Sequence, residues 1–254
     1  MDKKQYQFGL SEKYRDRLYD GEKRAIKAQK TLSILRDYFL GEGREMKSLS
    51  LLDIGCSNGF MTELYGGNFK DIVGIDIDAP AVEYAQKRNS SPNIRYLCED
   101  AMNTNFESES FDVITCSHIY EHVPDSKKLF LEIYRLLKKG GICFFAAGNR
   151  NSLIEAHYKL PLLSVIPKPL SHFYLRLLGR DRYYYEKHLS LWGLKKIVSS
   201  FEIIDYTLKI IRYPEKYSAT DMIRQGSLKQ KIFLALCHMA YWLCPTYIWV
   251  LRKN

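Results

Sequence analysis

Two short stretches of this 254-residue chain have the residue types and spacing of a nucleotide-binding pocket. Residues 51–60 form an apolar run that ends in a turn with Gly55 and Gly59, and a second apolar run, 71–76, ends at Asp76. Glycine allows backbone to approach a ligand closely, and a helix that begins just beyond offers unpaired N–H groups. An acid at the tip of the next parallel strand can accept hydrogen bonds from both ribose hydroxyls.

The glycine spacing distinguishes two classes of ligand. A dinucleotide site has the pattern Gly-x-Gly-x-x-Gly, but Ser57 occupies the middle position here and the third glycine is missing. Asp53, two residues before the first glycine, would repel a pyrophosphate but could face a cationic amino acid. Both observations argue against a dehydrogenase, which is the alternative enzyme for this layout.

In this first motif the chain resembles the class I S-adenosylmethionine-dependent methyltransferases, whose pattern is acid-x-Gly-x-Gly-x-Gly, with Ser57 as a departure. Three later segments resemble the family's third segment, its fourth strand, and its helix, glycine turn and fifth strand: residues 94–101, 111–117 and 136–146. The resemblance covers roughly residues 50–147 and implies S-adenosyl-L-methionine as the cofactor.

The resemblance also implies a role for each acid. Asp53 would orient the first loop and the methionine amino group, and Asp76 would bind the ribose hydroxyls with Ile77 against the adenine. Asp100 with Ala101 would contact the adenine edge. The predicted cofactor-binding residues are Asp53, Gly55, Cys56, Ser57, Asn58, Gly59, Asp76, Ile77, Asp100, Ala101 and Ser117.

These acids also have structural alternatives. Asp53 could be the N-cap of a helix, and Asp78 could bind the ribose while Asp76 caps the following helix. Glu99 competes with Asp100, because a solvated acid at a strand end is common.

Two histidines are candidates for the general base. Methyl transfer requires near-attack positioning, and removal of a proton if the acceptor is a hydroxyl. His122 is the first candidate and His118 the second, although either could instead be structural. Glu121-His122 resembles the Glu-His pair of quinone-ring O-methyltransferases, some of which are metal-assisted, but position 118 lacks their further acid, so no metal is predicted. The sequence does not rank the histidines in or beside the later insertion, His157, His172 and His188.

Alternating strands and helices predict a doubly wound, mostly parallel, Rossmann-like α/β sheet. A helix at 22–40, expected to pack against the sheet edge, comes first. Strands are expected at 50–54, 72–76, 94–98, 111–116 and 142–147, with helices near 59–65, 80–88 and 127–137. A helix at 190–199, a strand at 201–211, a helix at 228–243 and a strand at 246–252 follow. The resemblance implies seven strands, closed by an antiparallel one.

We expect one methyltransferase domain over residues 1–254. Its parts are an N-terminal helical segment (1–49), a cofactor-binding core (50–150), a substrate-side insertion (151–188) and the C-terminal part of the sheet (189–254).

Positive charge is concentrated in the C-terminal part of the chain. Residues 1–149 contain 21 Lys and Arg against 22 Asp and Glu, whereas residues 150–254 contain 17 against 7. Such a region favours anionic partners such as lipid headgroups, although it could be an ordinary solvated surface. No RNA-binding signature is present, so nucleic acid is not an expected partner.

The apolar stretch 232–251 is long enough to span a bilayer. Pro245 and Thr246 divide it, however, into an apolar helix and a segment suited to a closing strand, which favours surface association over spanning. The six cysteines form no Cys-x-x-Cys pair, and no signal peptide is evident, so reduced cysteines and a cytoplasmic location are expected.

The sequence therefore predicts S-adenosylmethionine-dependent methylation of a small or lipid-linked acceptor. The expected acceptor group is a hydroxyl, on a quinone or on an anionic polyprenyl-linked glycan. The alternatives are an RNA or protein methyltransferase and a non-catalytic membrane-surface protein that retains the fold.

Overall fold

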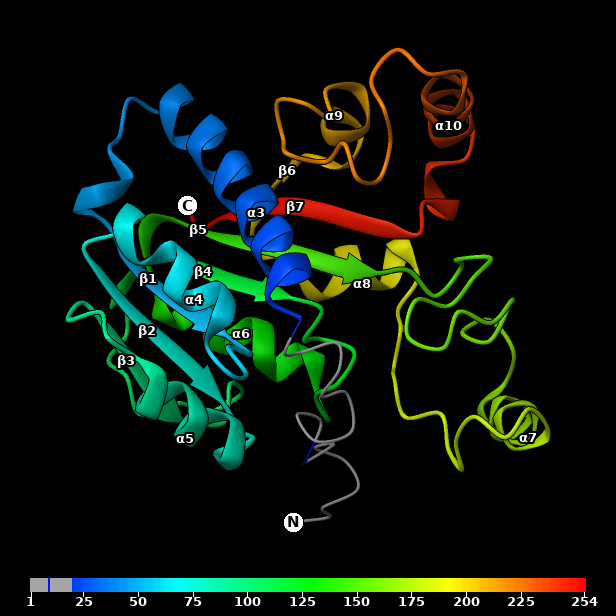
Figure 1. Cartoon of the computed structure of the whole chain (residues 1–254), viewed down its shortest axis with the longest axis horizontal. Coiled ribbons are helices and arrows are strands. Elements are labelled where there is room, and N and C mark those ends of the chain that lie inside the picture. The colour runs from blue at the N-terminus through cyan, green and yellow to red at the C-terminus, as the bar shows by residue number, and fades with distance from the viewer. Residues whose placement is uncertain (1–8, 10–19) are drawn as a thin grey trace.

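The computed structural model describes Gly9 and residues 20–254, and its centre is a seven-stranded sheet in the order β3-β2-β1-β4-β5-β7-β6 (Figure 1). The strands are β1 (Ser50–Ile54), β2 (Asp71–Asp76), β3 (Ile94–Cys98), β4 (Phe111–Ser117), β5 (Leu137–Gly148), β6 (Glu202–Asp205) and β7 (Thr246–Arg252). Paired strands are parallel except where β7 meets β5 and β6. The predicted doubly wound sheet with a closing antiparallel strand is confirmed.

Helices cover both faces of the sheet. One face carries α3 (Gly21–Gly41), α4 (Phe60–Tyr65), α5 (Ala79–Arg88) and α9 (Thr207–Arg212). The other carries α6 (Ser126–Leu136), α8 (Leu191–Ile197) and part of α10 (Leu228–Met239). The remaining elements are α7 (Lys168–Leu177) and the short helices η1 (Met46–Ser48), η2 (Gly66–Asn68) and η3 (Tyr241–Leu243).

Helix α3 lies across the middle of the sheet, so its predicted place at the sheet edge is wrong (Figure 1). The Asp20 side chain caps the helix by accepting from Lys23 N. Leu35 and Phe39, both fully buried, share one apolar cluster with residues of β1, β4, β5 and β7. A helix of 21 residues is about 30 Å long, which allows it to cross several strands.

The strand predicted at 201–211 is also wrong in its second half. Strand β6 ends at Asp205, whose Oδ1 accepts a hydrogen bond from Thr207 N at 2.8 Å. Thr207 Oγ1 in turn accepts from Ile248 N of β7 at 3.0 Å. This side-chain hydrogen bond takes the place of a backbone hydrogen bond between the two strands, and α9 begins at Thr207. The predicted helix at 228–243 likewise ends at Met239 and is followed by η3.

Strand β5 begins directly at the end of α6, earlier than the predicted 142–147. Its first part contains Gly140, whose φ is +70°, and the register to β4 shifts between Phe111 and Val113. The predicted glycine turn is therefore an irregularity within the strand.

The apolar stretch 232–251 is divided among α10, η3 and β7, as Pro245 and Thr246 predicted. Within residues 20–254, no helix combines the length and the apolarity that crossing a bilayer requires. None of the six cysteines forms a disulfide, and five are buried.

The loop that follows β3 is anchored to α6 through Glu132. Its Oε1 accepts from Thr104 N at 2.9 Å and from Thr104 Oγ1 at 2.6 Å, and Arg135 forms an ion pair with the same oxygen at 2.6 Å. Burial opposes ionisation, but the hydrogen bonds from Arg135 and Thr104 outweigh it and lower the pKa of Glu132 to about 2. This carboxylate thus holds the backbone next to the predicted adenine contact, Asp100.

We expect Glu132→Gln to lower the free energy of unfolding by about 2 kcal/mol at pH 7. Because the folded pKa is depressed, this stabilisation is complete above the unfolded value near 4.5 and is lost as the pH falls toward 2. Urea unfolding at pH 7 and pH 3 measures this difference in the free energy of unfolding. Glu107→Gln, at an exposed position nearby, should leave the free energy of unfolding almost unchanged. Equal effects of the two variants would contradict the stabilising role of Glu132.

Candidate cofactor and acceptor site

The turn after β1 folds back onto the carboxyl end of β2. Its residues Gly55, Ser57 and Gly59 have φ of +76°, +51° and +79°, and α4 begins at the next residue. The backbone N–H groups of Gly55 and Cys56 both donate to Ile75 O, at 2.8 and 3.0 Å. These bonds place the loop at the edge where the parallel strands end, which is where ligands bind in such sheets.

Both glycines of the loop lack space for a side chain. A Cβ on Gly55 would lie 2.1 Å from Ile119 Cδ1, and one on Gly59 would lie 2.7 Å from Tyr96 Oη. Tyr96 Oη donates to Gly59 O at 3.2 Å. The loop is therefore held between β3 and the segment that follows β4.

Asp76 holds the loop from the end of β2. Its Oδ2 accepts from Ser57 N at 2.8 Å and its Oδ1 accepts from Asp78 N at 3.0 Å, while burial raises its pKa. A carboxylate oxygen can accept more than one hydrogen bond, so both oxygens retain capacity for hydroxyl donors. Asp78 occupies the N-cap position of α5 without a side-chain capping bond, and Ile77 between them is partly buried.

Two polar side chains of the loop are enclosed. Asn58 is 1% exposed, and Ser57 Oγ is buried without a hydrogen-bond partner among the described residues. A buried hydroxyl without a partner costs free energy, which a ligand that bonds to it would recover.

Asp53 is buried beneath the loop and is not the N-cap of α4, which is Gly59. Its two oxygens accept from Thr115 Oγ1 and Thr62 Oγ1, each at 2.6 Å. Burial is the largest influence on Asp53 and raises its pKa. The carboxylate thus ties β1 to β4 and α4 directly beneath the turn.

Arg24 of α3 was missed in the sequence analysis. Its guanidinium interacts electrostatically with Asp53, and Nη1 lies 3.6 Å from Met61 Sδ. No local motif marks it, because the contact joins residues far apart in the chain. A guanidinium here could bind the carboxylate of an amino-acid ligand.

The end of β3 reaches the same edge through its backbone. Glu99 N donates to Asp76 O at 3.1 Å, and the Glu99 carboxylate accepts from Asn105 Nδ2 at 3.1 Å. Asp100 Oδ1 accepts from Met102 N at 2.9 Å and shapes the turn containing Ala101, which is partly buried. Asp100 and Asp76 are thus brought to neighbouring positions.

The segment after β4 combines a histidine with a buried carboxylate. Ser117 ends the strand, and His118 follows at φ +56° with its N–H donating to Ala146 O at 2.8 Å. His118 Nδ1 lies 3.3 Å from Glu121 Oε1, with the two side chains 38% and 0% exposed. Burial opposes ionisation of Glu121, but His118 and neighbouring histidines lower its pKa to about 2.

The His122 ring faces the insertion and also lies near Glu121, because one ligand atom each of Glu121, His122 and His157 lie within 4.8 Å of one another. Its centroid lies 5.1 Å from that of the His157 ring, and burial lowers the pKa of His122 to about 4, which leaves it neutral at neutral pH. His157 and His188 meet at Glu155, whose Oε1 lies 2.8 Å from His157 Nδ1 and 3.2 Å from His188 Nε2.

Histidine and carboxylate groups in this region could hold a metal ion, in contrast to the sequence prediction of none. Two sets of three ligand atoms lie within 4.8 Å of one another: Glu121, His122 and His157, and Glu155, His157 and His188. The third unranked histidine, His172, instead accepts from Tyr184 N at 2.9 Å within the insertion.

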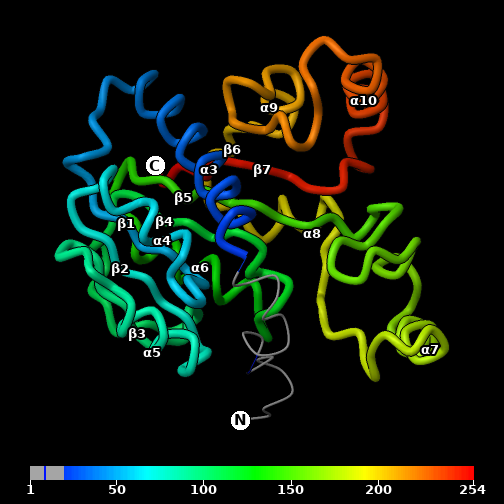
Figure 2. Tube along the Cα trace, in the orientation of Figure 1, coloured from blue at the N-terminus to red at the C-terminus, as the bar shows by residue number. Residues whose placement is uncertain are grey.

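Two backbone N–H groups, one at the end of the insertion and one just beyond it, donate to the segment after β4. Lys187 N donates to Glu121 O at 2.9 Å, and Leu189 N donates to Tyr120 Oη at 3.1 Å. Figure 2 shows the insertion, with α7, beyond the end of β5. The end of the insertion is therefore attached to the segment that follows β4.

Comparison with known proteins agrees with this geometry. Residues 52–145 match a family model described as a methyltransferase domain. A ubiquinone biosynthesis O-methyltransferase of Pseudomonas entomophila (strain L48) is 30% identical over 177 residues, covering 67% of this chain and 72% of that protein. One of Coxiella burnetii (strain Dugway 5J108-111) is 30% identical over 126 residues, covering 46% of this chain. The chain spans about half, 54%, of that Coxiella relative's length.

Solved structures share the fold. The plantazolicin methyltransferase BpumL, in complex with a monoazolic desmethylPZN analog and SAH, superposes with a TM-score of 0.59 at 19% identity, covering 96% of this chain and 89% of that one. Geranyl diphosphate C-methyltransferase from Streptomyces coelicolor A3(2) gives a TM-score of 0.51 at 16% identity, covering 87% of this chain and 78% of that one.

We expect Gly55→Val to weaken binding of S-adenosylmethionine at least ~100-fold, because the side chain would strain a positive φ and collide with Ile119. Isothermal titration measures the affinity. Gly140→Val is the matched control, because Gly140 has a φ of +70° but open space around its Cβ position. Unchanged affinity in a folded Gly55→Val protein would contradict the assigned site.

Proposed function

Because the chain belongs to the class I S-adenosylmethionine-dependent methyltransferases, we propose that it transfers a methyl group from S-adenosylmethionine to a hydroxyl oxygen of a small or lipid-linked acceptor. The observation that carries this proposal is the pairing of an enclosed glycine loop with a histidine and carboxylate at the same sheet edge. The names of the relatives support O-methylation.

The residues of the loop fit the parts of the cofactor. Asp76 would accept from the ribose hydroxyls, and the Ser57 hydroxyl would gain the partner that it lacks. Asp53 would act mainly by holding the loop, since two threonine hydroxyls already engage its oxygens. Arg24 would bind the methionine carboxylate. When bound, the cofactor supplies the sulfonium methyl group.

We assign the general base to His118, with Glu121 orienting its ring, in place of His122. The His118 side chain is 38% exposed, and so can meet an acceptor, whereas the His122 ring faces His157. A base whose second nitrogen is held by a carboxylate has a fixed tautomer and orientation. His118 Nε2 would then receive the acceptor proton as the oxygen–methyl bond forms.

The surface around the insertion supports a lipid-linked acceptor. On α7, Leu170, Phe173 and Leu177 are 57, 59 and 71% exposed and are spaced to form one stripe. Arg176 and Arg180 are exposed beside them. An apolar stripe with flanking cations is typical of helices that lie in an anionic membrane interface.

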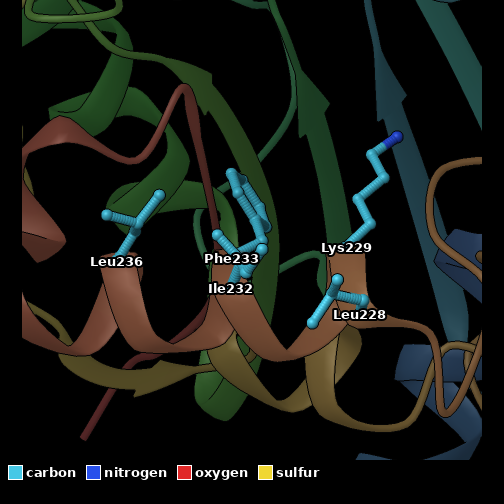
Figure 3. A pocket seen from close by; sticks show the side chains of 5 residues that line it. All are labelled: Leu228, Lys229, Ile232, Phe233 and Leu236. Carbon is cyan, nitrogen blue, oxygen red and sulfur yellow. The ribbon is translucent and has the colours of Figure 1, made fainter.

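Helix α10 presents a second surface of this kind. Leu228, Ile232 and Leu236 are 72, 52 and 55% exposed, and with Phe233 and Lys229 they line a shallow hollow (Figure 3). Figure 1 shows α7 and α10 on the side of the molecule toward which β5 points, at separate corners. The two helices would therefore bring a membrane-held acceptor to the site.

We expect the purified chain to transfer radiolabelled methyl groups from S-adenosylmethionine into the organic phase of a membrane lipid extract. His118→Asn should reduce the rate about 10²–10⁴-fold with cofactor affinity unchanged. The exposed His238→Asn is the control, and mass spectrometry identifies the methylated atom. Full activity of His118→Asn would remove the base assignment, and absence of product at any extract concentration would contradict a lipid-linked acceptor.

We expect the chain to bind vesicles that contain phosphatidylglycerol more tightly than vesicles of phosphatidylcholine alone, and less tightly at high salt. Replacing Phe173 and Leu177 by Glu should weaken binding at least ~10-fold in a sedimentation assay. Leu131→Glu, at a 65% exposed position of α6, is the control. Equal binding of all proteins would contradict the surface assignment.

A further inference from the structure

Two histidine nitrogens of the insertion lie close to one carboxylate oxygen, and the three ligand atoms are within 4.8 Å of one another. Glu155 Oε1 lies 2.8 Å from His157 Nδ1 and 3.2 Å from His188 Nε2. All three side chains are enclosed: Glu155 is 1% exposed, His157 19% and His188 4%. Glu155 and His157 belong to the beginning of the insertion, whereas His188 belongs to its end.

These separations match those of atoms that share a metal ion. With metal bonds of 2.0–2.1 Å, adjacent ligand atoms lie about 2.9 Å apart at right angles and about 3.3 Å apart at tetrahedral angles. Two histidines and one carboxylate form a donor set known in zinc enzymes and in non-heme Fe²⁺ sites. The geometry therefore needs little change to accept an ion.

Unpartnered buried atoms are a second, independent sign. Glu186 Oε2 is buried without a hydrogen-bond partner among the described residues, Glu186 is 1% exposed, and its carboxylate interacts electrostatically with Glu155, His157 and His188. His188 Nδ1, the ring nitrogen that does not face Glu155, is likewise buried without a partner among these residues. Within residues 20–254 the ion pairs of Glu155 involve imidazoles only, and none is found for Glu186. The nearby Lys168 Nζ donates instead to the backbone oxygens of Tyr184 and Glu186. The pocket thus encloses two carboxylates, and an ion at Glu155 would add to the positive charge that Lys168 already provides electrostatically.

We propose that Glu155, His157 and His188 form a binding site for a divalent transition-metal ion, with Zn²⁺ or Fe²⁺ as the class that this donor set favours. The site lies in the insertion and adjoins the Glu121-His122 pair, whose set of possible ligands also includes His157. It does not depend on the acceptor proposed above.

The ion would join the two ends of the insertion. Because its ligands come from both sides of α7, binding would close the loop between His157 and His188 and stabilise it. The insertion would then hold its place against the segment after β4, to which Lys187 and Leu189 already bond.

The test uses the full chain without a polyhistidine tag, stripped of metal and titrated with Co²⁺ as a spectroscopic probe. We expect one Co²⁺ per chain, visible d–d absorption, and displacement by Zn²⁺. Tryptic cleavage in α7 at Arg176 should slow when the ion is bound. X-ray absorption of the zinc-loaded protein should show two imidazole nitrogens at about 2.0 Å.

Glu155→Gln and His188→Asn should weaken Co²⁺ binding at least ~100-fold, whereas the exposed His238→Asn should not. Binding of S-adenosylmethionine by each variant verifies its fold. Absence of Co²⁺ binding at millimolar concentration, or equal binding by His188→Asn, would overturn the site and leave a hydrogen-bonded Glu–His cluster. Neither result bears on methyl transfer, which is measured separately.

Discussion

The whole site depends on the hydrogen bonds by which the turn after β1 attaches to the end of β2. Ile75 O accepts from two successive backbone N–H groups of this turn, and Asp76 Oδ2 accepts from a third, Ser57 N. Three left-handed residues make this approach possible, and Asp53 fixes the backbone beneath it through two threonines. Every other site residue is placed relative to this junction, because β3 and β4 pair with β2 and β1 in parallel register.

The sequence correctly predicted those elements whose local residue pattern agrees with their place in the folded structure. Alternating apolar runs predicted the parallel strands, and Gly55, Asp76, Asp100 and Ser117 were correctly placed at one edge because each ends or follows one of the first four strands. Pro245 and Thr246 correctly predicted that the apolar stretch 232–251 changes from helix to strand. In each case a short-range signal was enough.

The errors arose where side chains from distant segments decide the local structure. Residues 206–211 have the composition of a strand, but Thr207 bonds Ile248 N, and α9 begins instead. The apolar residues of α3 recur with a helical period, which predicts the helix but not the part of the sheet against which it packs. Arg24 and the meeting of His157 with His188 are long-range contacts, which no spacing within one segment encodes.

The chain divides into a core that the family model covers and an insertion that it does not. The family model matches residues 52–145, so it includes the loop, Asp76 and the His118–Glu121 pair but not the insertion. Yet Lys187 at the end of the insertion donates directly to Glu121 O, and the Glu121 side chain contacts His118. Under the proposed function, residues 151–188 would contact the acceptor, so acceptor choice could change through them while the cofactor loop stays the same. Such a separation would let one fold serve different acceptors.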